Sequence, residues 1–590
     1  MITLPYLALL SRARTMRSER LTRFVETLQR GSHLTSVYES PTMLILASSQ
    51  LPGIILPDGN GMILGYLFDR QSGTRVARDP GTPLDEPAER FVERYWGGYL
   101  ALRTRHATAE ILRDPSGAMP CYHVAMDDMH VFTSQPALLF HYGLAQPEID
   151  WTILTQGLVF QDLKPARTAL RGVSELLPGM SAKSLPPGLA LQCVWNPWRF
   201  THRTMEARDF AIATASVREA AVTCIGAWGQ CFDRPSVELS GGLDSSIVAA
   251  GLARINPLAS AMTYAALEGD PDETPYARAV ADRLGMKLDV AAPDIASIDI
   301  GVSEARDLPR PVARCFSQGY DRIAHDHARA IRADAFFSGG GGDNVFSYQR
   351  SLAPVRDRLI REGLSPGVIA TIGDIAALGD TSIWHVVLRT LRRSLRREPM
   401  PAWRADHALL SSDAIAALPL PQGNPWLEAP PASLPGKRAH VAALMEVQNH
   451  LEGHGRLAFA PIISPLLSQP VMEACLAVPS WLWCTGGRNR AVARAAFADA
   501  LPETVIARQS KGAFDGLAAR LVAANRDHLR ALLLEGCLAA QGLLDLDAVA
   551  AALDTATLES RTIVRLLTLA DVEAWARAWR IRLDDPRSAP

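Results

Sequence analysis

The chain has 590 residues, enough for about two to four domains with cores of ordinary size. Hydrophobic residues make up 48% of it and charged residues 21%, a composition that excludes an intrinsically disordered protein. Its 60 Lys and Arg residues balance 62 Asp and Glu residues to a formal net charge of -2, which argues against nucleic acid as a main partner.

The cysteines and the apolar segments bear on the compartment. The eight cysteines are scattered, without a CxxC pair or zinc-like spacing, which indicates reduced thiols in a cytoplasmic protein. The N-terminal apolar run has its charges after it rather than before it, so we expect no signal peptide. The most apolar candidate, after Ile247, is interrupted at Arg254 before it reaches the roughly 20 residues of a membrane span, so we expect none.

Residues 1 to about 200 predict a β-rich domain. Short strand-like runs lie near Gly, Pro or Asp residues at 42–46, 61–67, 99–102, 122–124 and 131–133. From about residue 205, apolar runs alternate with helix-length segments, which is typical of a parallel sheet. The prediction is therefore an α/β protein with an N-terminal domain over 1–203 and a C-terminal domain over 204–590, separated by Pro-containing segments at 185–188 and 195–198.

Two further segments stand out in the C-terminal half. The stretch 418–436 contains six prolines and predicts a surface loop. A basic helical cluster comprises Arg389, Arg392, Arg393, Arg396 and Arg397. Such a cluster is either a solvated helix face or a docking surface for an acidic peptide or partner protein.

A glycine-rich turn at 240–246 follows the predicted strand 236–239 and precedes a predicted helix. This order presents backbone N–H groups and the positive end of a helix dipole to an anion, and it suits pyrophosphate. The predicted contacts are Leu239, Ser240, Gly241, Gly242, Asp244, Ser245 and Ser246. No Lys follows the glycines, which excludes a Walker A loop, and Asp244 beside phosphates predicts a bound Mg2+.

The flanking pattern predicts a nucleotide-binding sheet. A strand over 261–265 ends at Ala265, a helix begins with Thr274 as its N-cap and ends at Gly285, and another strand starts at Leu288. The strand 335–337 runs into a second glycine-rich loop, Ser338-Gly339-Gly340-Gly341-Gly342-Asp343. Because ligands bind at the carboxyl edge of such sheets, we assign Ala265, Ser338 and Gly339 to the ATP site and Asp343 to the metal with Asp244.

The loop at 240–246 resembles the pyrophosphate loop of the asparagine synthetase class of ATP-dependent amide-forming enzymes. Segments 96–99, 113–117, 132–134 and 175–179 resemble landmarks of its glutamine amidotransferase domain. The resemblance implies an N-terminal αββα domain of the glutaminase (N-terminal nucleophile) type and a C-terminal parallel-sheet domain of the adenine-nucleotide α-hydrolase type.

Two departures refine what this resemblance implies. Residue 2 is Ile2 where a glutaminase of the class has its nucleophilic Cys, and the first cysteine is Cys121, so we expect an inactive scaffold and an amine that comes from the substrate. Gly340 and Asn344 stand where asparagine synthetases carry Glu residues, and β-lactam synthetases carry a Tyr at the position of Gly340. The four-glycine form resembles lasso peptide cyclases, which join the N-terminal amine of a linear core peptide to an Asp or Glu side chain.

A lasso peptide cyclase would use ATP as cosubstrate with Mg2+, and release AMP and pyrophosphate. Its implied partners are the core peptide, a leader-binding protein and a leader peptidase. Arg508-Gln509-Ser510-Lys511-Gly512 resembles the basic segment of the family, so Lys511 is the expected catalytic lysine. The sequence does not assign the general base: Glu446 or Glu452 could take the amine proton, with a solvated helix face as the alternative role for each, and Glu452 is placed in the catalytic set.

Several other residues that could be functional are assigned to structural roles. We assign the neighbours His454 and Glu452 to chance proximity rather than a metal pair, and Trp481 and Trp483 to the core rather than a peptide groove. Ser464–Leu467 and Arg488–Arg490 are assigned to core packing or the surface. The alternatives to a cyclase are a small-molecule synthetase that makes asparagine from ammonia or closes a β-lactam ring, and an inactive binding protein.

Overall fold

The N-terminal half contains two antiparallel six-stranded sheets, which confirms the predicted β-rich character. The computed structural model describes residues 5–11, 19–77, 86–105, 108–126, 129–185, 188–207, 209–267, 270–349, 351–395, 405–419, 421, 423–509 and 515–584. The first sheet has the order β10-β8-β9-β1-β3-β2, with β1 (Tyr6–Ser11), β2 (Leu34–Ser40), β3 (Met43–Ser48), β8 (Tyr122–Met126), β9 (Met129–Thr133) and β10 (Val173–Glu175). The second has the order β12-β11-β7-β6-β5-β4, with β4 (Gly53–Ile55), β5 (Gly61–Asp69), β6 (Tyr95–Arg105), β7 (Thr108–Arg113), β11 (Met180–Leu185) and β12 (Gly188–Cys193).

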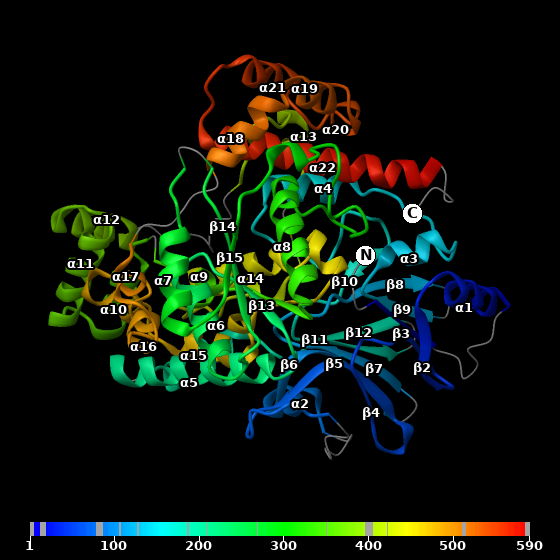
Figure 1. Ribbon diagram of the computed structural model, residues 1–590, viewed down its shortest axis with the longest axis horizontal. Helices are drawn as coiled ribbons and strands as arrows, with labels where there is room; N and C mark the ends of the chain where they lie inside the picture. The colour runs from blue at the N-terminus through cyan, green and yellow to red at the C-terminus, as the bar shows by residue number, and fades with distance from the viewer. Residues whose placement is uncertain are drawn as a thin grey trace.

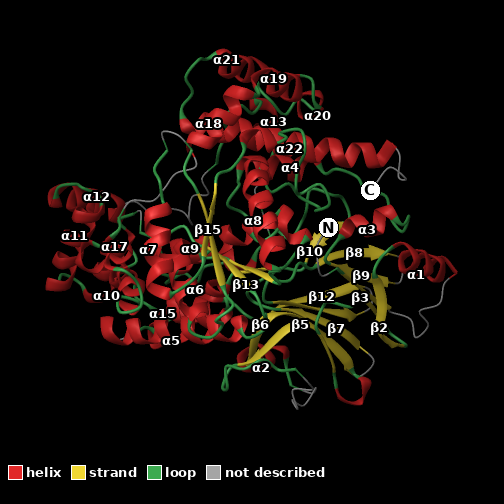
Figure 2. Cartoon of the chain, in the orientation of Figure 1, coloured by secondary structure: helices red, strands yellow, loops and turns green. Residues whose placement is uncertain are grey.

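The two sheets pack face to face between outer layers of helices (Figure 2). Ala8 and Ile45 of the first sheet share a buried cluster with Leu64 and Leu102 of the second. Because side chains alternate along a strand, Leu7 next to Ala8 points to the opposite face. That outer face is covered by α1 (Glu19–Gly31), α3 (Pro136–His141) and α4 (Trp151–Val159), while α2 (Ala88–Arg94) packs on the second sheet.

The C-terminal half is built on a parallel sheet, as the sequence predicts. Its order is β15-β14-β13-β16-β17, with β13 (Pro235–Glu238), β14 (Ser260–Tyr264), β15 (Leu288–Ala291), β16 (Ala335–Phe337) and β17 (Ile462–Ile463). Val237 of β13 is in register with Ala261 of β14 and Phe337 of β16. After β13 the chain adds β14 and β15 on one side of it, and then adds β16 and β17 on the other side. The direction in which strands are added therefore reverses between β13 and β16. In such sheets this is where ligands bind.

Helices α5 (Phe210–Gly229), α6 (Leu243–Ala253), α7 (Thr274–Leu284), α8 (Gln318–Ile331) and α9 (Gly342–Val345) accompany this sheet. The prediction that Thr274 is the N-cap of α7 is wrong by one residue: Glu273 holds that position, and the Thr274 amide donates to Asp272 Oδ1 at 2.9 Å. The predicted end is correct, since Gly285 adopts a left-handed φ of 65°.

The remaining helices form two groups at the edges of the molecule (Figure 1). One group is α10 (Ala353–Glu362), α11 (Pro366–Leu378) and α12 (Ile383–Leu395); the other is α18 (Asp515–Ala524), α19 (Arg526–Leu534), α20 (Cys537–Ala540), α21 (Leu546–Asp554) and α22 (Ser560–Asp584). Between these groups in the sequence come α13 (Ser412–Ala416), α14 (Pro435–Val447), α15 (Gln469–Ala477), α16 (Ala491–Ala496) and α17 (Glu503–Ala507). In the basic cluster, Arg389, Arg392 and Arg393 are exposed on α12, while Arg396 and Arg397 lie outside the described residues.

The described residues of the proline-rich stretch 418–436 are irregular apart from a short 3-10 turn over Pro425–Leu427 and the first residues of α14. Trp426 in that turn is buried, and its carbonyl accepts a hydrogen bond from Trp198 Nε1 at 2.9 Å. Part of this stretch therefore packs against the N-terminal half instead of forming a purely surface loop.

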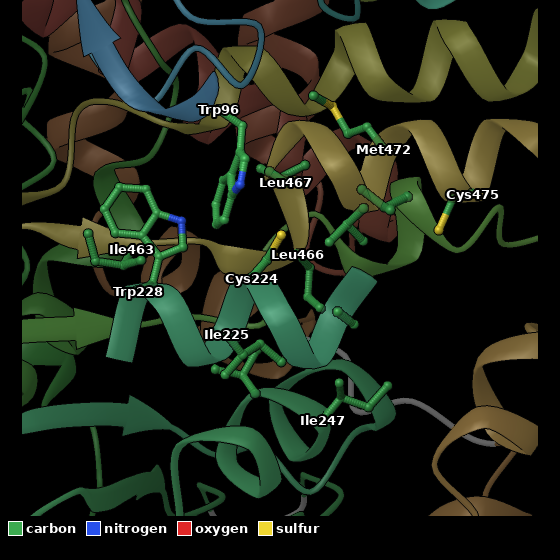
Figure 3. Packing of buried hydrophobic residues seen from close by; sticks show 14 of the residues in the cluster. Trp96, Cys224, Ile225, Trp228, Ile247, Ile463, Leu466, Leu467, Met472 and Cys475 are labelled. Atoms are coloured by element: carbon green, nitrogen blue, oxygen red, sulfur yellow. The ribbon is translucent and has the colours of Figure 1, made fainter. Parts of the chain in front are cut away.

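The two halves share one hydrophobic core (Figure 3). Trp96 of the second sheet lies close to Trp228 of α5 and Met472 of α15 in this cluster. Among the described residues, α5 is long and apolar enough to cross a membrane, which corrects the expectation that no segment is. One face of α5 is buried in this shared core, the arrangement that an apolar core helix requires.

Candidate functional site

The two glycine-rich loops meet at the carboxyl edge of the parallel sheet. Gly242 caps the N-terminus of α6, and Gly241 takes a left-handed φ of 66°, which allows the tight turn after β13. A Cβ on Gly339 would lie 2.4 Å from the Ser245 backbone nitrogen, so only glycine permits this approach of the loops. The sequence-predicted juxtaposition is therefore present in the structure.

A cavity of about 430 Å3 opens over these loops, a volume within the range of small-molecule sites. Its walls include the predicted residues Leu239, Ser240, Gly242, Asp244, Ser245, Ala265, Ser338 and Gly339. Two predicted contacts lie elsewhere. Ser246 is fully buried and donates to the Gly242 carbonyl at 2.7 Å, and Gly241 packs against Tyr276. These two residues hold the turn in place behind the cavity wall.

The carboxylates of Asp244 and Asp343 converge on the guanidinium of Arg490. Its Nη1 lies 2.9 and 2.8 Å from the two oxygens of Asp244 and 2.6 Å from Asp343 Oδ1. Arg490 lines the cavity with Arg488 and Asn489, so the assignment of 488–490 to core packing or the surface is wrong for this segment.

The positions of the Asp244 and Asp343 carboxylates test whether these residues could bind the predicted Mg2+. Carboxylate oxygens are the donors that Mg2+ prefers, and here two side chains aim them at one point, so the residues fit this ion. Within the described ranges no group of three or more His, Cys, Asp or Glu side chains could hold a metal. Phosphate and water oxygens would therefore complete the coordination, as is usual for Mg2+ at nucleotide sites.

A second arginine, Arg508, lies against the first loop. Its Nη2 donates to Glu273 Oε1 at 2.6 Å and its Nη1 to the Gly241 carbonyl at 3.4 Å, while its guanidinium lies 4.2 Å from the Tyr276 ring centre. Arg494 fixes this segment through its hydrogen bond to the Arg508 carbonyl at 2.7 Å. Lys511, the predicted catalytic lysine, lies outside the described residues.

A cavity of about 310 Å3 adjoins the first one behind Gly340. Both cavities are lined by Glu238, Ser338 and Gly340, and the second also reaches Ser116 and Ala118 of the N-terminal half. Gly340 therefore lies where the nucleotide cavity borders a second cavity that reaches the N-terminal half.

A cluster of buried charges lies beside this second cavity, and Glu238 and Arg456 of the cluster line it. Arg456 Nη1 contacts Glu238 Oε1 and its Nε contacts Asp321 Oδ1, both at 2.6 Å, and the Tyr264 hydroxyl donates to Glu238 at 2.6 Å. Burial, together with the neighbouring Asp321, raises the pKa of Glu304 to about 8. The cluster is thus arranged with one of its carboxyl groups neutral at physiological pH.

Glu452 lies at the interface of the two halves. The Tyr122 hydroxyl donates to its Oε2 at 2.7 Å, while its Oε1 has no hydrogen-bond partner among the described residues. Burial raises the pKa of Glu452, and its side chain borders an interdomain cavity of about 400 Å3. Next to it, His454 contacts Arg314; burial and that cation lower the pKa of His454, so the ring is neutral.

Other predicted residues have structural positions. Trp481 and Trp483 are buried in the 3-10 segment Ser480–Gly487, which agrees with their assignment to the core. Cys121, the first cysteine of the chain, is fully buried, and burial raises its pKa to about 12. It is therefore no substitute for an exposed, reactive thiolate.

Comparison with known proteins identifies the family. Residues 232–577, more than half of the chain, match the model of the asparagine synthase family. The chain belongs to this family. Its members are ATP-dependent amide ligases that release AMP, and this chain is an enzyme of that class. No match was found among curated proteins.

Two solved structures match part of the chain at low identity and low TM-score. One is described as the allosteric regulatory enzyme of purine biosynthesis; it has 8% identity over 49% of this chain and 82% of its own, with a TM-score of 0.22. The other is the glutamine phosphoribosylpyrophosphate amidotransferase from B. subtilis complexed with ADP and GMP, with 10% identity, 50% and 83% coverage, and a TM-score of 0.21.

Proposed function

We propose that this asparagine synthase family member is a lasso peptide cyclase: it adenylates an Asp or Glu side chain of a linear core peptide and joins it to the peptide's N-terminal amine. The observation that carries the proposal is Gly340. Gly340 borders both the nucleotide cavity of about 430 Å3 and the adjoining cavity of about 310 Å3, and it adds no side chain to either. A substrate much larger than aspartate requires such space.

The first step forms the acyl-adenylate. A carboxylate oxygen of the peptide attacks the α-phosphorus of ATP, and the bond from that phosphorus to the pyrophosphate oxygen breaks. The N-terminus of α6 and the turn at Ser240 and Gly242 present N–H groups to the phosphates. Arg508 is held beside this turn and supplies positive charge for the leaving pyrophosphate. Asp244 and Asp343 would hold Mg2+, which when bound withdraws charge from the phosphate oxygens.

The second step forms the amide. The amine nitrogen attacks the acyl carbon, the bond from that carbon to the AMP oxygen breaks, and the amine loses one proton. We assign the proton to Glu452, a buried carboxyl with an unpaired oxygen at the junction of the two halves. Lys511 is proposed to stabilise charge on the phosphate and acyl oxygens. A clamped peptide gains from proximity, and an enclosed site limits hydrolysis of the adenylate.

This function implies specific partners. A core peptide must arrive unfolded and with a free amine, so a leader-binding protein and a leader peptidase would act before this enzyme, in the cytoplasm. The departure at Ile2 supports an amine that comes from the substrate, since no glutaminase nucleophile stands there.

Mass spectrometry tests the proposal. The linear core peptide, with its leader removed, is incubated with the protein, ATP and Mg2+, and the loss of one water together with AMP formation is the expected result. Asp244→Ala should abolish both. An unchanged peptide would refute the cyclase assignment, and aspartate with ammonia would then be screened for pyrophosphate release.

A further inference from the structure

Arg490 occupies the place where the two metal-binding carboxylates converge. One nitrogen, Nη1, contacts Asp244 and Asp343 at once, at 2.6 to 2.9 Å. The arginine side chain is only 10% exposed, and its guanidinium lies 5.4 Å from the centre of the Tyr348 ring. These contacts hold a cation firmly at this point.

The backbone fixes the residue in the same way. Arg490 adopts a left-handed φ of 57°, an uncommon conformation for a residue with a side chain, and its carbonyl accepts from the Arg494 amide at 3.0 Å at the start of α16. The preceding Asn489 exchanges two hydrogen bonds with the backbone of Gln349, at 2.7 and 2.9 Å. The base of the Arg490 side chain is therefore anchored, and only its end can change partners.

Two carboxylates this close repel each other, and in a largely buried site the repulsion is weakly screened. The positive charge of a guanidinium between the two carboxylates reduces this repulsion. A divalent ion would contact the same oxygens at about 2.0–2.1 Å if it were Mg2+. Since ion and guanidinium need the same oxygens, the two cations exclude each other.

We propose that Arg490 is an exchangeable counter-ion of the metal site. In the nucleotide-free protein it neutralises Asp244 and Asp343 and keeps free divalent ions out. Arrival of the metal–nucleotide displaces the guanidinium from the carboxylates onto the phosphates. This inference rests on the proposed metal role of the two carboxylates.

The position of Arg490 supports the exchange. It lines the nucleotide cavity together with Ser240 and Gly242, so its freed end stays beside the space that the phosphates would fill. Arginine suits this change of partner because its planar fork matches carboxylate and phosphate geometry alike. The consequence is an order of binding in which the metal enters with the nucleotide and not before it.

The test is Mn2+ binding to the nucleotide-free protein, followed by electron paramagnetic resonance, with wild type compared with Arg490→Gln. We expect Arg490→Gln to bind one Mn2+ about tenfold or more tightly than wild type, since a charge-assisted contact with the carboxylates is removed. The same variant should bind ATP more weakly in the presence of Mn2+, because a phosphate contact is lost. A merely structural role would not move the two affinities in opposite directions.

Matched variants complete the design. Arg218→Gln removes an arginine that pairs with Asp499 and does not line the nucleotide cavity, so its Mn2+ affinity should equal that of wild type. Arg490→Lys keeps the charge and should exclude Mn2+ better than Arg490→Gln does, which also guards against a folding defect in the glutamine variant. Adding Asp343→Asn to Arg490→Gln should abolish the new Mn2+ site.

The outcomes separate this inference from the metal assignment. Wild type and Arg490→Gln could bind Mn2+ equally tightly, and both could lose this binding when Asp343→Asn is added. That result would overturn the counter-ion role and leave the metal assignment intact. Absence of Mn2+ binding in both proteins, with and without ATP, would overturn the metal assignment and the inference together.

Discussion

Gly339→Ala is the perturbation that most directly tests the meeting of the two loops. An added Cβ would lie 2.4 Å from the Ser245 nitrogen, 2.8 Å from the Ser245 Cα and 2.8 Å from the Asp244 carbonyl carbon. All three are backbone atoms in the first turn of α6, so the clash cannot be relieved by a side-chain rotation. Overpacking of this kind costs about 1–3 kcal/mol, and here its relief moves the loops apart.

The neighbouring Gly340→Ala is the matched control. The nearest atoms to its Cβ would all belong to side chains, Ser338 Oγ at 3.2 Å, Ser464 Oγ at 3.7 Å and Ser338 Cβ at 3.9 Å, and its φ is not in the left-handed region. We expect Gly339→Ala to lower the melting temperature and to weaken ATP binding about tenfold or more, while Gly340→Ala changes neither appreciably. Calorimetric ATP titration and thermal denaturation measure both. Equal ATP affinities and melting temperatures for the two variants would refute the close approach of the loops.

Three further predictions concern the second cavity and its surroundings. Gly340→Tyr should block peptide cyclisation and leave ATP binding intact, because it closes the junction of the two cavities; undiminished product by mass spectrometry would contradict this. Glu304 has its pKa raised to about 8, above the 4.5 of the unfolded chain, so the folded protein binds an extra proton and loses stability as the pH rises from about 4.5 to 8. Glu304→Gln should therefore show a smaller drop in melting temperature over this interval, and a drop parallel to that of wild type would show that another group is responsible. Glu452→Gln should slow amide formation by about 10²–10⁴-fold without slowing pyrophosphate release in single-turnover measurements; an unchanged rate would remove Glu452 from the mechanism.

The phosphate loops were predictable from the sequence because local chemistry determines them. A buried strand, a glycine turn and a helix start occupy consecutive residues at 236–246, and the same holds for the strand and glycines at 335–343. Parallel strands then bring both turns to one edge of the sheet. The structure adds that Ser246 faces away from the cavity, since its position on the first turn of α6 directs the hydroxyl back to the Gly242 carbonyl.

Arg490 was not predictable in the same way. It lies 246 positions from Asp244 along the chain, and nothing local distinguishes Arg488-Asn489-Arg490 from a polar surface turn. Its partner carboxylates are set by the sheet, while its own position depends on the packing of α16 and the contact of Asn489 with Gln349. Long-range ion pairs of this kind follow from tertiary structure alone. The unexpected apolar length of α5 has a similar origin, since its buried face packs against residues of both halves.

The N-terminal half stays coupled to the synthetase half through packing, whatever its own chemistry. Phe68 stacks on Trp96 with ring centres 4.4 Å apart and meets the edge of Trp228 at 4.9 Å, while Trp195 Nε1 donates to Glu473 at 2.8 Å. Trp96 is fully buried in this shared core, so Trp96→Ala should lower the unfolding free energy by about 3–5 kcal/mol.

The exposed Trp384 of α12, 75% accessible, is the matched control, and Trp384→Ala should leave the melting temperature unchanged. By the same argument a chain of residues 204–590 should not fold alone, because the partners of Trp228 would be replaced by water. Thermal denaturation of the two tryptophan variants and size-exclusion chromatography of the truncated chain test this. A monomeric truncated chain that still releases pyrophosphate would show that the shared core is dispensable.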